Sequence, residues 1–374
     1  MNVLSLFDGM SCGQQALERN GIKVDNYFAS EIDKYAITVT MANYPNTKQL
    51  GSVVDVDGYS LPKIDLLIGG SPCQSFSFAG KRKGMSTKDE QEILTLEHYL
   101  ELKNEGFEFE GQSYLFWEYM RLLNECQPKY FLLENVEMGE RWEKVLSKAI
   151  GVNGIHINSS LVSAQNRKRI YWTNIGLEPS GLFGFPQSII KQPKERGILL
   201  NKILEDKVDE KYYINPKANK RLMQTLSNNK IEKYCIIDSY NKTIHTNKSI
   251  TISTRVSASS CTHVYKESKK IKQVNKSKES GGVQPFQQNR VYDASGIAPS
   301  LCANLGGDRS YLIDLPKIRR LTPIECERLQ TVKDNYTNHV SDSQRYKMIG
   351  NGWTIEVICH ILNAANWHIK ISEY

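Results

Sequence analysis

The chain has 374 residues, of which 40% are hydrophobic and 24% charged, a composition typical of a globular protein with a substantial core. Its sequence has no apolar run long enough to span a membrane, and its eight cysteines are scattered without a Cys-x-x-Cys pair. We therefore expect no membrane helix, zinc cluster or disulfide framework, and the length favours two domains. The first residues lack the features of a secretory signal, so a reducing, intracellular setting is expected.

The positive charge is concentrated in one segment. Residues 178–317 hold 23 Lys and Arg against 13 Asp and Glu, whereas the rest of the chain holds 25 against 28. Such an excess of basic residues favours a polyanion as the partner of this segment. A solvated, lysine-rich surface would also account for it, so charge alone does not establish nucleic-acid binding.

Strands and helices alternate over residues 1–177. In chain order we expect a strand at 3–7, a helix at 14–20, a strand at 24–29, a helix at 34–43, and strands at 64–68 and 130–133. This alternation predicts βαβ units and an α/β domain with a Rossmann-like, mostly parallel sheet. Near the end, residues 345–365 combine a glycine turn with isoleucines at helical spacing, and this helix should pack back on the first domain.

Residues 178–317 differ in character. They are rich in Lys, Asn, Ser and Gly, with short β-like stretches at 234–237 and 249–253. This pattern predicts a second, smaller, irregular and β-rich domain. The run 266–278 is polar and basic, as expected of an exposed loop.

Residues 7–13 (Phe-Asp-Gly-Met-Ser-Cys-Gly) lie between the first strand and the first helix. Glycines there allow the backbone to approach a ligand closely, and a helix N-terminus offers free amide donors. Glu31 ends the next strand, where a carboxylate can accept hydrogen bonds from ribose hydroxyls. The combination indicates a ligand that contains adenosine, although glycine-rich turns often have no ligand at all.

A thiol and a carboxyl group follow two further strands. Cys73 comes after the strand at 64–68, and Glu134 and Asn135 follow the strand at 130–133. Because the carboxyl ends of parallel strands line the ligand crevice of an open sheet, these side chains should share one site. A thiolate beside a proton-donating carboxylic acid can attack an electron-poor ring and hold its nitrogen protonated. Taken singly, a buried cysteine is more often inert packing and Glu134 could be a structural carboxylate.

Residues 165–169 (Gln-Asn-Arg-Lys-Arg) precede a strand-like Ile-Tyr-Trp. They bring two guanidinium groups toward the same crevice, where these could bind a phosphate or fix a carboxylate. The simpler alternative is a charged turn before a strand.

The order of these motifs resembles that of the cytosine-C5 DNA methyltransferase family in its bacterial and phage form, over nearly the whole chain. The resemblance implies a class I methyltransferase fold, S-adenosylmethionine as methyl donor and double-stranded DNA as partner. The matching stretches are residues 5–9 (Ser-Leu-Phe-Asp-Gly), 71–74 (Ser-Pro-Cys-Gln), 134–136 (Glu-Asn-Val), 165–169 (Gln-x-Arg-x-Arg), 320–330 (Arg-Leu-Thr-Pro-x-Glu-x-x-Arg-Leu-Gln) and 344–352 (Gln-x-Tyr-Lys-x-Ile-Gly-Asn-Gly).

The resemblance implies a set of catalytic roles. Cys73 would attack C6 of cytosine while Glu134 engages N3, so that C5 takes up the methyl group before the thiolate leaves. Arg167 would anchor the base or its phosphate, Arg169 would support the carboxylate, and Asn135 would hold the loop that presents Glu134. The base would have to be flipped out of the duplex. No metal is implied, because the sulfonium already activates the methyl group.

The resemblance also implies the cofactor residues. Phe7 is expected against the adenine and Glu31 at the ribose, with Gly9 and Ser11 at the methionine end. The other implied cofactor residues are Asp8, Gly13, Ile32, Ser52, Val53, Pro72 and Gly352, with Leu115 and Asn351 closing the pocket.

Two departures from the family pattern stand out. Ser52 occupies the position after Gly51 where an acidic residue usually meets the adenine amino group, and Asp55 could compensate. The chain also has a long, partly helical insertion between residues 84 and 114, in a region that closes over DNA in the family. The insertion could alter that closure, bind a partner, or simply elaborate the surface.

We expect a catalytic and cofactor-binding domain at 1–177 completed by 341–374, a target-recognition domain at 178–318, and a connecting motif at 319–340. A tRNA cytosine-C5 methyltransferase is an alternative, but those relatives have a shorter recognition region than the basic segment found here. A non-catalytic, DNA-binding regulator would have lost Cys73 or Glu134. A nicotinamide-dependent dehydrogenase would need a three-glycine phosphate motif that is missing. We expect a monomer in the cytoplasm of a bacterial or phage-infected cell, with a cognate restriction endonuclease as a possible partner.

Overall fold

The computed structural model describes residues 1–72, 92–109, 112–180, 185–213, 234–238, 243–245, 248–249, 262–266, 317–365 and 367. The chain divides into two compact units. The first comprises residues 1–205, 248–259 and 322–374, and the second comprises 206–247 and 260–321. The first unit thus extends beyond residue 177 and takes in a short segment from the middle of the basic region. Cys73 and nearly all of the stretches 249–253 and 266–278 lie outside the described residues.

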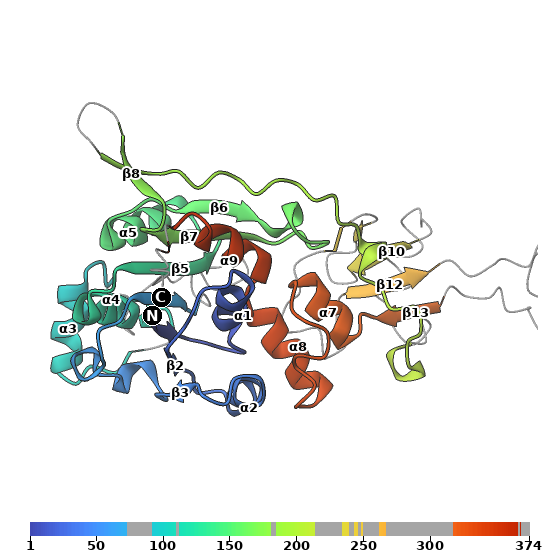
Figure 1. The fold of residues 1–374 in the computed structure, drawn as a ribbon, viewed down its shortest axis with the longest axis horizontal. Coiled ribbons are helices and arrows are strands. Elements are labelled where there is room, and N and C mark those ends of the chain that lie inside the picture. Colours follow the sequence, from blue (N-terminus) through green and yellow to red (C-terminus); the bar gives the residue numbers. More distant parts are fainter. Residues whose placement is uncertain are drawn as a thin grey trace, which may run out of the picture. The chain divides into compact units, whose positions relative to one another are not determined.

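The first unit is built on a seven-stranded sheet (Figure 1). Neighbouring strands run in the order β3-β2-β1-β4-β5-β7-β6, with all pairs parallel except β5–β7 and β6–β7. This confirms the α/β, mostly parallel sheet of the class I methyltransferase type. The strands are β1 (Asn2–Leu6), β2 (Asn26–Ser30), β3 (Lys48–Gln49), β4 (Leu66–Gly70), β5 (Tyr130–Val136), β6 (Ile155–Asn158) and β7 (Lys168–Thr173).

Helices cover both faces of this sheet because side chains alternate between the faces along each strand. On one face α1 (Cys12–Arg19) lies against β4, and α9 (Ile355–Leu362) packs against α1. At Gly13 a Cβ would lie 2.2 Å from Cδ1 of Ile68, so only glycine lets α1 approach the strand this closely. On the other face Leu67 belongs to a core with residues of α4 (Leu115–Cys126) and α5 (Glu140–Ile150). The predicted return of the last helix to the first domain is confirmed.

The remaining helices have recognisable local causes. In α2 (Lys34–Asn43), Asp33 caps the N-terminus by accepting a hydrogen bond from the Tyr35 amide. In α7 (Pro323–Leu329), Thr322 and Glu325 form a reciprocal capping box around a proline at the first turn. The next helix is α8 (Asp342–Asn351). None of the helices in the described ranges is both long and apolar enough to cross a membrane.

The insertion contains a helix, α3 (Leu96–Asn104), that is docked on α4. The anchor is Glu118 of α4, whose side chain is fully buried. Its carboxylate accepts hydrogen bonds from the Tyr99 hydroxyl and the Lys103 ammonium, each at 2.5 Å, and from Arg121 at 2.7 Å. The described part of the insertion is therefore an integral layer of the first unit.

The described strands of the second unit form an antiparallel sheet in the order β11-β10-β12-β13. They are β10 (Tyr234–Asp238), β11 (Thr243–His245), β12 (Thr262–Lys266) and β13 (Lys317–Arg320). The predicted strand at 234–237 is present. In the first unit, a hairpin of β8 (Leu177–Ser180) and β9 (Phe185–Ser188) follows the large sheet.

Candidate active site

The loop between β1 and α1 is held in a strained conformation. Phe7, Gly9 and Ser11 have φ angles of 57°, 58° and 59°, in the left-handed region that non-glycine residues rarely adopt. Each such non-glycine residue costs about 1–3 kcal/mol and persists only where surrounding contacts enforce it. Strain of this kind is typical of ligand-binding loops, and it lies on the stretch expected to bind the cofactor.

Asp8 enforces this loop from within. Its buried carboxylate accepts hydrogen bonds from the hydroxyls of Ser11 and Tyr27, both at 2.7 Å. Burial raises the pKa of Asp8 to about 6, although the hydroxyl donors act in the opposite direction. Asp8 therefore organises the loop from the protein side.

Glu31 joins the carboxyl ends of β1 and β2. Its Oε2 accepts a hydrogen bond from the Gly9 amide, and its Oε1 accepts from the amides of Ile32 and Asp33, all at 2.8 Å. A carboxylate has about four acceptor positions, so about one remains for a hydroxyl group. The neighbouring Ile32 side chain is 74% exposed, which makes it an apolar surface beside this carboxylate. Glu31 thus offers a hydrogen-bond acceptor directly beside an apolar surface.

Ser52 follows β3 at the same edge of the sheet and starts a short 3-10 turn, Val53–Asp55. Ser52 is partly exposed, Val53 is buried, and Asp55 is exposed one turn further on. Phe7 and Leu115 are both partly buried and pack on the same hydrophobic core. Phe7 and Ser52 thus follow β1 and β3, the two strands adjacent to the strand β2 that Glu31 follows.

The turn between α8 and α9 lies against the first loop. A Cβ on Gly352 would lie 2.7 Å from Cε of Met10 and 3.2 Å from Sγ of Cys12. The structure thus brings the last motif of the chain onto the first one, with Asn351 exposed beside the contact. Gly13, by contrast, serves the packing of α1 on Ile68.

Glu134 lies at the carboxyl end of β5 with both oxygens engaged. Arg169 Nε lies 2.9 Å from Oε1, and the indole Nε1 of Trp353 donates to Oε2 at 3.2 Å. The carboxylate sits directly beside the β4 backbone, since a Cβ on Gly70 would lie 3.1 Å from Oε2. Glu134 is 8% exposed. This geometry supports the expected pairing of Arg169 with the carboxylate.

Asn135 reaches the strand that leads toward Cys73. Its side-chain amide donates to Oγ of Ser71 at 3.1 Å, and its side-chain oxygen accepts from the Val136 amide. Glu134, Asn135 and Val136 belong to strand β5, beyond the predicted strand end at 133, and Asn135 connects this strand end with the residue before Pro72. The contact thus holds the ends of β4 and β5 together, and Pro72 is the last described residue before Cys73.

Arg167 lies against the turn between α8 and α9. Its side chain is 2% exposed, and its guanidinium donates to the carbonyl oxygens of Gly350 at 3.2 Å and Gly352 at 2.9 Å. Burial, with the nearby charge of Arg169, lowers its pKa below the usual value. Through these contacts Arg167 helps to fix the α8–α9 turn.

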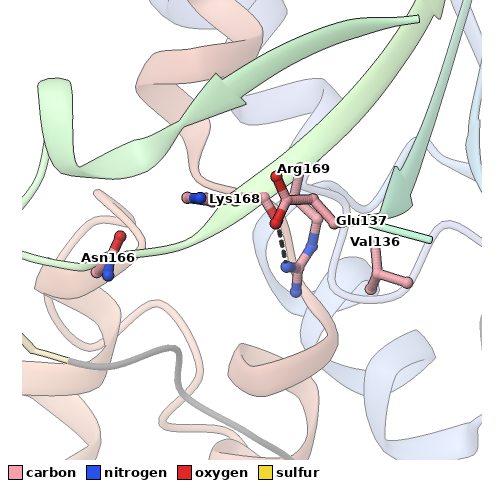
Figure 2. Close-up of a pocket in the computed structure, with 5 residues that line it drawn as sticks. All are labelled: Val136, Glu137, Asn166, Lys168 and Arg169. Atoms are coloured by element: carbon pink, nitrogen blue, oxygen red, sulfur yellow. Dashed lines mark hydrogen bonds between the residues drawn. The ribbon is translucent and has the colours of Figure 1, made fainter. Parts of the chain in front are cut away.

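A small open pocket of about 270 Å³ borders this cluster (Figure 2). It is lined by Val136, Glu137, Asn166, Lys168 and Arg169. Within it the Arg169 guanidinium also donates to the Lys168 carbonyl at 2.7 Å, the bond dashed in Figure 2. The Arg169 side chain is thus fixed between the Glu134 carboxylate and the backbone carbonyl of Lys168.

Two residues of the cluster were missed by sequence reasoning. Trp353 contacts Glu134, and the buried Gln330 donates from its amide to the carbonyls of Ile349 and Gly352 and accepts from the Thr354 hydroxyl. Gln330 is the last residue of the motif at 320–330, and Trp353 directly follows the motif at 344–352. The signal for Trp353 was an indole donor next to a glycine turn, whereas Gln330 had no signal beyond its place in the motif.

Known proteins share this fold. Over 97% of the chain, the fold matches solved structures of Spodoptera frugiperda DNMT2, with a TM-score of 0.56 and 18% identity, and of the Entamoeba histolytica methyltransferase EhMeth, with 0.55 and 15%. The matches cover 98% and 97% of those two chains. At such identities they establish the fold alone.

Sequence relatives extend over nearly the whole chain. The orphan methyltransferase M.SPRI of Bacillus phage SPR is 28% identical, covering 96% of this chain and 95% of the relative. The type II methyltransferase M.Bsp6I of a Bacillus species is 26% identical, covering 96% and 97%. The family model for C-5 cytosine-specific DNA methylases matches residues 1–367. The chain therefore belongs to the C-5 cytosine-specific DNA methylase family.

Proposed function

We propose how the residues of this DNA (cytosine-5-)-methyltransferase divide the work of transferring a methyl group to C5 of cytosine. The observation that carries the proposal is the cluster at the ends of β4 and β5. There Asn135 holds Ser71, two residues before Cys73, and Arg169 and Trp353 hold Glu134.

Cys73 is the proposed nucleophile and Glu134 its acid partner. The thiolate adds to C6 of the cytosine while Glu134 shares a proton with N3, which makes C5 nucleophilic. After methyl transfer, loss of the C5 proton and departure of the thiolate restore the aromatic ring. Arg169 keeps the Glu134 carboxylate oriented, and Arg167 holds the turn that carries Trp353. None of these steps needs a metal ion.

The family uses S-adenosylmethionine, which supplies a methyl group activated by its sulfonium. We propose that the strained loop at 7–11 receives its methionine end and that Glu31, through its remaining acceptor position, binds the ribose. Ile32, Phe7 and Leu115 would provide apolar contacts, and Asn351 and Gly352 would border the same pocket. Ser52 would take the place of the usual acidic residue near the adenine, with Asp55 exposed close by in sequence.

As a member of this family the protein acts on DNA, and the basic stretch at 178–318 is the proposed target-recognition region. Its excess of lysines and arginines would contact phosphates and help offset the few kcal/mol that flipping a base costs. We further propose a monomer that works in the cytoplasm. A partner endonuclease is a testable possibility, since two of the relatives named above are an orphan and a type II methyltransferase.

The decisive experiment is transfer of a labelled methyl group from S-adenosylmethionine to duplex DNA, followed by mapping of the methylated cytosines. We expect label on DNA with the wild-type protein and none with Cys73→Ala. Cys126→Ala is the matched control and should retain full transfer, because this cysteine lies at the end of α4. Label that persists in Cys73→Ala would overturn the nucleophile, and label found on tRNA in place of DNA would overturn the substrate.

A further inference from the structure

Among the described residues, Glu134 is held by an ion pair with Arg169 and by a hydrogen bond from Trp353, and these two partners come from different parts of the chain. Arg169 belongs to the motif at 165–169, whose role beside the carboxylate was expected from sequence. Trp353 lies in the turn after α8, directly after the stretch 344–352 that the motif pattern associates with the cofactor. Its indole N–H nevertheless donates to Oε2 of Glu134 at 3.2 Å.

The surroundings leave this contact little freedom. Trp353 is 8% exposed, so its ring and the carboxylate meet in a largely water-free place. Gly70 lies beside both, since a Cβ there would be 2.9 Å from the indole nitrogen and 3.1 Å from Oε2. A hydrogen bond to a charged acceptor contributes more than one between neutral groups, especially when water is excluded. The indole therefore helps to determine where Oε2 points.

Trp353 also touches the loop expected to bind the cofactor. Its carbonyl oxygen lies 3.9 Å from the Cys12 thiol, and the adjoining Gly352 packs on Met10 and Cys12. On the other side, Arg167 and Gln330 both donate to the Gly352 carbonyl. The turn is thus fixed between the first loop and the carboxylate.

We propose that Trp353 is a positioning residue for the methyl-transfer step: through its indole N–H it orients Glu134 and links the carboxylate to the cofactor loop. The inference rests on the proposed role of Glu134 in one respect, namely that the carboxylate acts on the cytosine ring. It adds to that role a second, uncharged donor that acts together with Arg169.

Trp353→Phe tests the proposal because it removes the donor and keeps an aromatic ring. In single-turnover methyl transfer with saturating DNA and S-adenosylmethionine, we expect the rate to fall about 10-fold or more, the scale of a hydrogen bond to a charged group. The KM for DNA and the dissociation constant of the cofactor should change less than about 3-fold. A residue that acts in the transition state lowers the rate and leaves the binding of the substrates nearly unchanged.

Trp172→Phe is the matched control. Trp172 is fully buried in β7, and its indole donates to the Ser147 hydroxyl at 2.9 Å, so the control loses a comparable hydrogen bond away from Glu134. It should lower thermal stability without slowing methyl transfer. Equal slowing in both variants, or weaker cofactor binding with an unchanged rate in Trp353→Phe, would overturn the proposal.

A double-mutant cycle with Glu134→Gln separates this inference from the role of Glu134 itself. If Trp353 acts through the carboxylate, Trp353→Phe should slow Glu134→Gln much less than it slows the wild type. An unchanged, full effect in that background would overturn the inference. A Glu134→Gln protein that methylates at the wild-type rate would instead remove the proposed role of Glu134.

Discussion

At the scale of single residues, the active site is organised by buried polar groups that are bonded to protein atoms. Asp8, Asn135 and Arg167 are buried and make hydrogen bonds to other protein groups. Burying such groups is costly unless hydrogen bonds satisfy them. These bonds hold the first loop, the end of β4 and the turn between α8 and α9 in place.

Asp8 gives a pH-dependent prediction. Because burial raises its pKa from 3.8 to about 6, the folded protein binds a proton there that the unfolded chain has lost between pH 4 and pH 6. Within that window Asp8 lowers the free energy of unfolding as the pH rises, by at most about 3 kcal/mol. Asp8→Asn should remove this slope, so that the variant matches the wild type near pH 4 and exceeds it in stability at pH 7.

Urea unfolding at several pH values between 4 and 7 measures this difference directly. Asp55→Asn is the control, because Asp55 is exposed and should leave the wild-type pH dependence unchanged. Curves for Asp8→Asn and wild type that run parallel across the whole range would contradict the prediction.

At the scale of elements, local signals determined what could be predicted. The helix at 34–43 was predicted with its observed limits because Asp33 provides a cap and Tyr44 ends it without competing signals. The strand predicted at 64–68 was placed two residues too far toward the N-terminus, because β4 runs from Leu66 to Gly70. It continues through two glycines that look like a turn in the sequence. Those glycines belong to the strand because Tyr119 and Trp353 pack where side chains would otherwise stand.

Contacts between distant segments could not be predicted in this way. The sequence predicted that Glu134 and Arg169 lie near the same crevice, but their approach follows from the antiparallel pairing of β5 with β7, which was not predicted. Trp353 and Glu134 are 219 residues apart, and no local pattern encodes their contact. The motif pattern predicted which residues lie near one another in the site. Their individual hydrogen-bond and ion-pair partners are determined by the tertiary packing.

The docking of the insertion helix α3 gives the second prediction. Glu118 is fully buried and is the shared partner of Tyr99, Lys103 and Arg121. Glu118→Gln would remove the buried counter-charge of Lys103 and one of the two carboxylates paired with Arg121, which keeps Glu125. Breaking a buried pair typically costs about 3–5 kcal/mol. We expect a large fall in the unfolding free energy, measured by chemical denaturation.

The comparison variant is Glu140→Gln, which breaks the exposed pair of Glu140 with Lys144 and should leave stability unchanged. If α3 is a surface elaboration, Glu118→Gln protein that remains folded should still methylate DNA at the wild-type rate. A stability as high as that of the wild type would show that the buried network contributes little.

At the scale of the whole molecule, the two ligands should respond differently to salt. The catalytic part of the chain is close to neutral, while residues 178–317 carry ten more positive than negative charges. DNA binding that neutralises phosphates releases counterions, so its affinity falls steeply with salt; six to ten phosphate contacts correspond to a loss of about 10³–10⁵-fold between 50 and 200 mM. The proposed cofactor site consists of a carboxylate, backbone amides and apolar side chains, so the affinity for the cofactor should change much less.

The last prediction assigns this salt dependence to the basic segment. Replacing Lys269, Lys270 and Lys272 by glutamine should reduce the slope of log affinity against log salt by about one for each lysine that contacts a phosphate. Lys144→Gln together with Lys148→Gln, on the exposed face of α5, removes positive charge outside this segment of the sequence and should leave the slope nearly unchanged. Fluorescence anisotropy of a labelled duplex, measured at several salt concentrations, distinguishes the two sets.

Because a phosphate contact carries no sequence information, the methylated sites should be the same in all variants, while the affinity for every duplex falls by a similar factor. Equal slopes in both sets would mean that the excess charge is a solvated surface, and that DNA is held by the rest of the molecule.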